Sequence, residues 1–134
     1  MIRWFERHSG VSWIITIFGA AAIFYVSSLE FAGGGIGGTN FLAIAYHISA
    51  FFCFSAFLLI SMIGGKRRNF IFPAVLIAVA YAVSDEIHQF FVPSRSCTLF
   101  DVWLDSIGIV FALMIYGIIL VKRKMIKQNE SIKL

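Results

Sequence analysis

The sequence predicts an all-α, polytopic membrane protein: a single domain over residues 1–134, built as a bundle of four transmembrane helices. The first observation is composition: 60% of the 134 residues are hydrophobic and 13% are charged, against roughly 45–50% and about 25% in soluble domains. A chain this short has too little interior to bury that apolar content, which excludes both a soluble monomer and a disordered chain. The second observation is four continuous apolar runs, each near the length of about 20 residues that crosses a bilayer core.

The first two predicted spans are residues 11–31 and 41–63. The first follows a basic segment that contains Arg3 and Arg7. We expect it to be kept as a span rather than removed as a signal peptide, because its apolar run exceeds the roughly 7–15 residues of a signal-peptide core. A glycine-rich linker at residues 33–38 separates the two spans.

The third and fourth predicted spans are about residues 70–91 and 99–121. A charged turn at residues 64–69 precedes the third span, and a short turn at residues 93–98 leads into the fourth, with Thr98 as its predicted N-cap. Transmembrane strands are excluded, because they alternate apolar and polar residues over about ten positions. These four runs are instead continuous and about twice that length.

The basic residues predict how the chain is oriented. Ten of the eleven Lys and Arg residues fall on one side if all four runs span the membrane, and only Arg95 falls on the other. Basic residues favour cytoplasmic loops, so both termini are predicted to be cytoplasmic. Nucleic acid is not an expected partner, because the basic residues form short clusters beside apolar runs. Glu6 and Glu130 are expected to be solvated charges near the chain ends.

Ionisable residues gather near the outer ends of three predicted spans. At a rise of about 1.5 Å per residue, His47, Asp85 and Asp105 lie about 9, 8 and 6 Å below the outer face. Each belongs to a different span, so the three can meet at one depth. Charged groups inside a membrane are costly and usually face partners or water. We therefore expect an outward-facing polar site.

The helical faces agree with these depths. Four residues of the third span lie within about 100° of arc, namely Tyr81, Asp85, His88 and Gln89. On the fourth span Asp101 and Asp105 are four residues apart and share a face, which Gly108 continues inward. Small residues let another helix approach closely, so this face is predicted to meet a neighbouring helix.

The candidate site residues divide by chemistry. The candidate catalytic groups could act as general acids and bases: Asp85, Glu86, His88, Asp101 and Asp105. The candidate binding residues are His47, Arg95, Gln89 and Tyr81. Arg95 suits the phosphate of an anionic lipid, and we expect it to pair with a carboxylate while the site is empty. Histidines and carboxylates could also hold a divalent metal ion, but no H-x-x-x-H or H-E-x-x-H spacing marks one, so no cofactor is assigned. A network that only joins the spans is the alternative.

One segment resembles the VanZ-like membrane proteins. It reads YAVSDEIHQFFVPSR over residues 81–95 and is followed by Asp101, Asp105 and Gly108. Residues 25–28 and the pair His47 and Phe51 are also similar to the first two spans of that family, so the resemblance covers about residues 25–116. The best-known member of this family is associated with teicoplanin resistance.

The resemblance implies a multi-pass protein of the bacterial plasma membrane. Together with the polar site, it indicates membrane lipids as partners, including an anionic or phosphate-bearing envelope lipid or lipid-linked precursor. Two functions are expected as alternatives. One is an enzyme acting on an outer-leaflet envelope lipid or a lipid-linked cell-wall precursor; the other is a non-catalytic binding or protection factor that lowers glycopeptide (teicoplanin) susceptibility. An ion carrier is disfavoured, because the inner halves of the last three spans lack ionisable residues.

Overall fold

The computed structural model describes residues 2–30, 41–65, 67–93, 95 and 98–132, and every regular element in these ranges is helical. The elements are α1 (Ile2–Arg7), α2 (Ser9–Ser27), α3 (Phe41–Ile63), the 3₁₀ turn η1 (Arg68–Phe70), α4 (Ile71–Phe90) and α5 (Leu99–Ile132). Four segments are long and apolar enough to cross a membrane: α2, α3, α5 and the segment Arg68–Phe90 formed by η1 and α4. The predicted all-α architecture with four membrane helices is confirmed. The predicted linker at residues 33–38 lies outside the described residues.

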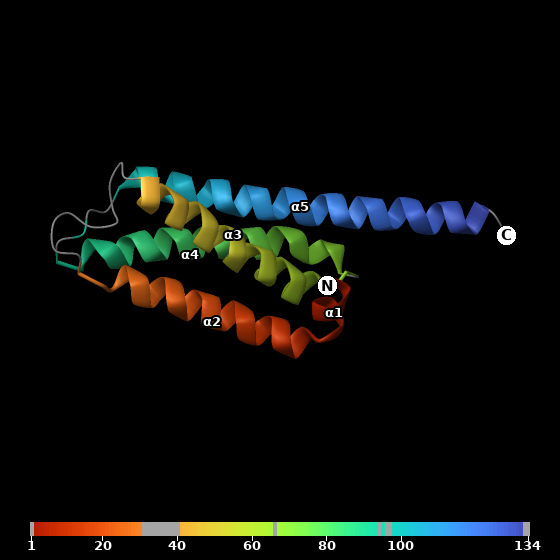
Figure 1. Cartoon of the computed structure of the whole chain (residues 1–134), viewed down its shortest axis with the longest axis horizontal. Helices are drawn as coiled ribbons and strands as arrows, with labels where there is room; N and C mark the ends of the chain where they lie inside the picture. The colour runs from red at the N-terminus through yellow and green to blue at the C-terminus, as the bar shows by residue number, and fades with distance from the viewer. Residues whose placement is uncertain (1, 31–40, 66, 94, 96–97, 133–134) are drawn as a thin grey trace.

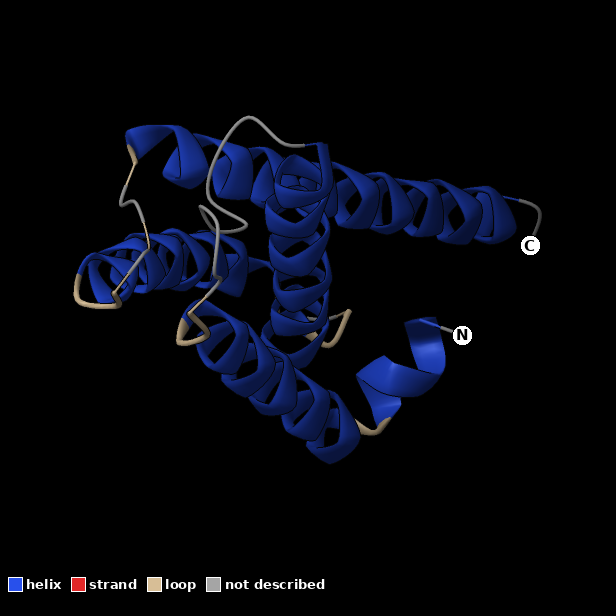
Figure 2. Cartoon of the chain, turned by 60° about the vertical axis from the view of Figure 1, so that its left-hand side comes forward, coloured by secondary structure: helices blue, strands red, loops and turns tan. Residues whose placement is uncertain are grey.

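The helix α3 is the central element of the bundle. It contacts α1, α2, α4 and α5, whereas α2 and α5 share no contact in the described part of the chain. Figure 1 shows α1 and the C-terminal half of α5 at the same end of the bundle. Figure 2, turned by 60°, shows α3 in the middle of the other helices. Among the described helices, α3 and α5 form the most extensive contact, which runs from the His47–Asp105 contact to the hydrogen bond between Gly65 and Tyr116.

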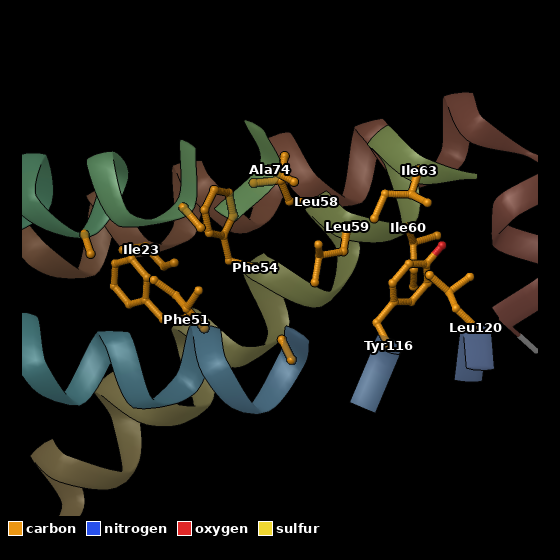
Figure 3. Packing of buried hydrophobic residues seen from close by; sticks show 14 residues of the cluster. Ile23, Phe51, Phe54, Leu58, Leu59, Ile60, Ile63, Ala74, Tyr116 and Leu120 are labelled. Atoms are coloured by element: carbon orange, nitrogen blue, oxygen red, sulfur yellow. The ribbon is translucent and has the colours of Figure 1, made fainter. Parts of the chain in front are cut away.

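Aromatic and aliphatic side chains of α3 form the centre of the core (Figure 3). Phe51 and Phe54 are buried there, against residues of α2, α4 and α5. On α4 the buried apolar positions are Ala74, Ala78 and Ala82, which are four residues apart and share a face. This stripe of small side chains lets α4 lie close against its neighbours.

Two helix ends differ by more than two residues from those predicted, and one helix was not predicted. The first span ends at Ser27 rather than at residue 31, and Ser28 closes its last turn by donating its hydroxyl to the Phe24 carbonyl at 2.7 Å. The fourth span does not stop at Val121 but continues to Ile132, because residues 122–132 contain no glycine or proline and are mostly good helix formers. The apolar run ends at Val121, but the helix does not. The short helix α1 lies in a segment that is too polar and too short to be recognised as a span.

The closest approach between helices is at Gly108 on α5. A Cβ atom added there would lie 2.9 Å from the backbone nitrogen of Phe52 and still closer to the carbonyl oxygen of Ile48, both on α3. Only a glycine fits against backbone atoms at such distances. The prediction that this face of the fourth span meets a neighbouring helix is therefore confirmed.

Candidate functional site

The first polar contact joins α3 to α5. His47 Nδ1 and Asp105 Oδ1 are 2.9 Å apart, and the two side chains are 2% and 1% exposed. Asp105 lies one helical turn before Gly108, and Gly108 packs against the residue that follows His47. The close approach of the two backbones therefore places the histidine and the carboxylate opposite each other.

The second contact joins α4 to the end of α2. Ser27 Oγ donates a hydrogen bond to Asp85 Oδ2 at 2.8 Å, and Gln89 Nε2 donates to the same oxygen at 2.9 Å. All three side chains are buried. Gln89 comes one turn after Asp85, so it shares a face with the carboxylate that it orients.

The third contact fixes the start of α5. Glu86 Oε1 accepts the backbone N–H of Thr98. Thr98 Oγ1 accepts the backbone N–H of Asp101 at 3.3 Å and donates to Asp101 Oδ2 at 2.8 Å. The prediction that Thr98 is the N-cap is confirmed, and the Asp101 carboxylate lies in the first turn, where the helix dipole favours a negative charge.

Five buried groups from α3, α4 and α5 thus lie together, and we call them the acidic cluster: His47, Asp85, Glu86, Asp101 and Asp105. The charge of Asp105 is within reach of His47, Asp85 and Asp101, and the charge of Glu86 is within reach of His47, Asp101 and Asp105. Three of these five, His47, Asp85 and Asp105, are the residues that the depth arithmetic placed near one level. Within the described ranges, no three His, Cys, Asp or Glu side chains are arranged to hold a metal ion.

Three carboxylates of the acidic cluster each keep one buried oxygen that has no hydrogen-bond partner among the described residues. These atoms are Asp85 Oδ1, Glu86 Oε2 and Asp105 Oδ2. A buried acceptor without a donor costs about 1–3 kcal/mol. A network that served only to join the helices would gain stability by satisfying these atoms or by omitting them.

Arg95 and Tyr46 lie beside the acidic cluster. Arg95 is half-buried, and its Nη2 donates to the Val26 carbonyl at the end of α2 at 2.7 Å. Tyr46 on α3 is within reach of the charges of Asp85, Arg95 and Asp105, although the sequence did not single it out. The pairing of Arg95 with a carboxylate stays a prediction.

Two predicted site residues turn toward α2. His88 Nε2 lies 2.9 Å from Ser28 Oγ, and the His88 ring stacks on Phe24 with a centroid distance of 4.3 Å. Tyr81 donates its hydroxyl to the Ala20 carbonyl at 2.6 Å. Both residues therefore connect α4 to α2 by hydrogen bonds. Neither the Tyr81 hydroxyl nor the His88 imidazole contacts the His47–Asp105 pair.

Three hydroxyl side chains that hold the site were missed as partners: Ser27, Ser28 and Thr98. The signal that could have found them is their position, because Ser27 and Ser28 lie near the end of the first predicted span and Thr98 lies just before the fourth, near the depth of the acids. One expectation at the opposite end of the bundle is wrong. Glu6 is not a solvated charge, because its side chain is only 7% exposed and contacts Arg123 at 2.7 Å. Glu130 is exposed, as expected.

The fold and the acidic cluster define a class of protein. It is a multi-pass membrane protein that carries buried ionisable residues near one end of its helical bundle. A family model described as VanZ/LLP1 matches residues 12–120, a stretch that includes every candidate site residue. The chain belongs to the VanZ/LLP1 family, which confirms the resemblance and fits a membrane protein of the cell envelope. No curated protein and no solved structure matches the chain.

Proposed function

We propose that this protein binds a phosphate-bearing lipid or lipid-linked precursor of the outer membrane leaflet and acts on it through the acidic cluster. The observation that carries the proposal is the set of three buried carboxylate oxygens without a partner among the described residues, on Asp85, Glu86 and Asp105. Ionisable groups are retained inside membranes mainly where they function. A carboxylate with one oxygen fixed and the other unengaged is suited to exchange a proton with a bound ligand.

The residues in and around the acidic cluster have different roles in this proposal. Arg95 holds the phosphate, because a guanidinium can donate two parallel hydrogen bonds to its oxygens. Ser27 and Gln89 hold one oxygen of Asp85, which leaves the other directed at the ligand. In a transfer at this phosphate, one carboxylate of the cluster takes the proton of the attacking hydroxyl as its oxygen bonds to phosphorus, and a second, protonated carboxyl group gives a proton to the oxygen whose bond to phosphorus breaks.

An apolar groove between α2 and α3 supports a lipid as the ligand. It encloses about 280 Å³ and is lined mainly by apolar side chains. Two lining residues, Val26 and Tyr46, connect it to the acidic cluster. The Val26 carbonyl accepts the hydrogen bond from Arg95, and Tyr46 is within reach of the charge of Arg95. An acyl chain in this groove would place its headgroup beside Arg95.

Filling the groove is expected to expel the lipid without unfolding the protein. A Cβ atom added at Gly19, which lines the groove, meets nothing within 4 Å, so the backbone there accepts a side chain, and the ring of Gly19→Phe is expected to take up space in the groove. We expect the amount of phosphate-bearing lipid that copurifies with the protein, measured by mass spectrometry, to fall several-fold at an unchanged melting temperature. The matched control is Gly117→Phe on α5, where an added Cβ also meets nothing within 4 Å. Equal lipid retention by both variants would contradict a lipid site in the groove.

We further propose that both termini are cytoplasmic, which puts the acidic cluster on the outer side of a bacterial plasma membrane. The support is that ten of eleven basic residues fall on one side. In single-cysteine variants, Cys97 is expected to react with a membrane-impermeant maleimide added to intact cells, and Cys53 in the groove is not. Cys97 lies outside the described residues, in the turn predicted from sequence. Labelling of Cys97 only after permeabilisation would reverse the orientation.

A further inference from the structure

A second polar hollow lies at the opposite end of the bundle, where α1, the turn after α3 and the middle of α5 meet. It encloses about 440 Å³ and is lined by Arg3, Glu6, Arg7, Gly64, Gly65 and Arg123; we call it the basic hollow. None of these residues belongs to the acidic cluster or takes part in the proposed function. In the sequence alone, the arginines of the basic hollow indicated only how the chain is oriented in the membrane.

Among the described residues that line the basic hollow, Glu6 is the one carboxylate, and it is already paired. Arg123 Nη1 donates to both carboxylate oxygens of Glu6, at 2.8 and 2.7 Å, and the Tyr116 hydroxyl donates to Oε1 at 2.9 Å. Arg3 and Arg7 are four residues apart on α1 and line the same hollow. The walls therefore carry two positive charges that Glu6 does not balance.

The turn after α3 closes tightly over the Glu6–Arg123 pair. Gly64 and Gly65 adopt φ of 54° and 69°, in the left-handed region that favours glycine. A Cβ added at Gly65 would lie 3.0 Å from Glu6 Oε2 and 3.4 Å from Arg123 Nη1. A side chain at Gly65 would therefore press on the ion pair as well as strain the backbone, so glycine suits the turn that lines this side of the hollow.

The basic hollow lies at the level of lipid headgroups. Arg123 comes two residues after Val121, where the last apolar run ends. Trp4, on the same short helix as Arg3 and Arg7, is 50% exposed and stacks on His8 at a centroid distance of 4.3 Å. Exposed tryptophans on membrane proteins concentrate where the hydrocarbon core meets the headgroups.

We propose that the basic hollow binds a phosphate monoester group, carried by a lipid headgroup or by a soluble phosphate ester. Guanidinium groups donate paired hydrogen bonds that match phosphate oxygens. The two uncompensated charges of Arg3 and Arg7 match a phosphate monoester, which carries a charge of about −1.5 to −2 at neutral pH. Binding would fix α1 against α5 through the two arginines and the Glu6–Arg123 pair.

The test is a thermal melt of the full chain in detergent with two probes, dioleoyl phosphatidic acid and glycerol 3-phosphate, and with dioleoyl phosphatidylcholine as the control lipid. We expect phosphatidic acid to raise the melting temperature by several degrees and phosphatidylcholine to leave it unchanged. The double variant Arg3→Gln with Arg7→Gln is expected to need at least about tenfold more phosphatidic acid for the same shift. The charge-matched control is Lys124→Gln with Lys127→Gln, which neutralises two exposed side chains of α5 that do not line the hollow.

The outcomes separate the sources of the phosphate and the two sites. A shift with phosphatidic acid alone identifies a lipid headgroup, and a shift with glycerol 3-phosphate as well identifies a phosphate ester in general; both support the proposal. Equal loss in the two double variants, or no shift with either probe, would overturn it. The shift is expected to persist in Gly19→Phe, which blocks only the apolar groove, so failure at one site can be told from failure at the other.

Discussion

Replacing Gly108 with alanine is expected to destabilise the bundle by on the order of 1–3 kcal/mol. The added methyl group would lie 2.9 Å from the Phe52 nitrogen and closer still to the Ile48 carbonyl oxygen. Both are backbone atoms of the central helix and cannot rotate away, so α3 and α5 would have to separate. Because the same crossing aligns His47 with Asp105, the separation would also lengthen that contact.

The matched control is Gly117→Ala on the same helix. A Cβ added at Gly117 meets nothing within 4 Å, and alanine is favoured over glycine in helices by roughly 1 kcal/mol. We expect thermal melts in detergent to show a lower melting temperature for Gly108→Ala and an unchanged or higher one for Gly117→Ala. Equal melting temperatures would show that the crossing of α3 and α5 tolerates a wider spacing than the structure has.

The four spans could be predicted from the sequence because bilayer thickness fixes the length of an apolar helix. What hydropathy does not report is where helicity stops. The polar segment after Val121 stays helical to Ile132, because its residues favour a helix whether or not lipid surrounds them. In the same way, α1 is too short and too polar to stand out, and it is held by packing against α2 and α3.

The acidic cluster could be predicted in outline because depth follows from counting residues along a helix. Which side chains hold each acid could not, because that depends on the rotation and packing of neighbouring helices. Asp85 is oriented by Ser27 from another span, and serine is too common in membrane helices to mark a site by itself. Glu6 shows the same limit, because its partner Arg123 is more than a hundred residues away in the chain.

Asp85→Asn is expected to abolish function while leaving the fold intact. Asp85 Oδ2 accepts hydrogen bonds from Ser27 at 2.8 Å and from Gln89 at 2.9 Å, and the carbonyl oxygen of asparagine can accept both. The substitution therefore removes the negative charge and the capacity to take up a proton, and it puts an amide NH2 group at the position of Oδ1, which has no partner among the described residues. Burying a neutral amide costs less than burying a charged carboxylate, and the two hydrogen bonds from Ser27 and Gln89 are kept, so the melting temperature is expected to change little.

The measurement compares Asp85→Asn with Ser27→Ala in a bacterial strain that carries the variant as its only copy. General acid–base catalysis contributes roughly 10²–10⁴-fold to a rate, so turnover of the copurifying lipid is expected to fall at least about 100-fold in Asp85→Asn, although the lipid still binds. Ser27→Ala keeps the charge and loses one hydrogen bond, worth about 1 kcal/mol, so it should retain most of the function.

If Asp85→Asn retains the lipid and also keeps full function, read as growth and teicoplanin susceptibility, the protein is a non-catalytic binding or protection factor. If function falls in both variants only as far as the melting temperature falls, the Asp85 carboxylate serves the fold alone. Substituting a group that transfers a proton would instead lower the activity of the protein without lowering its stability.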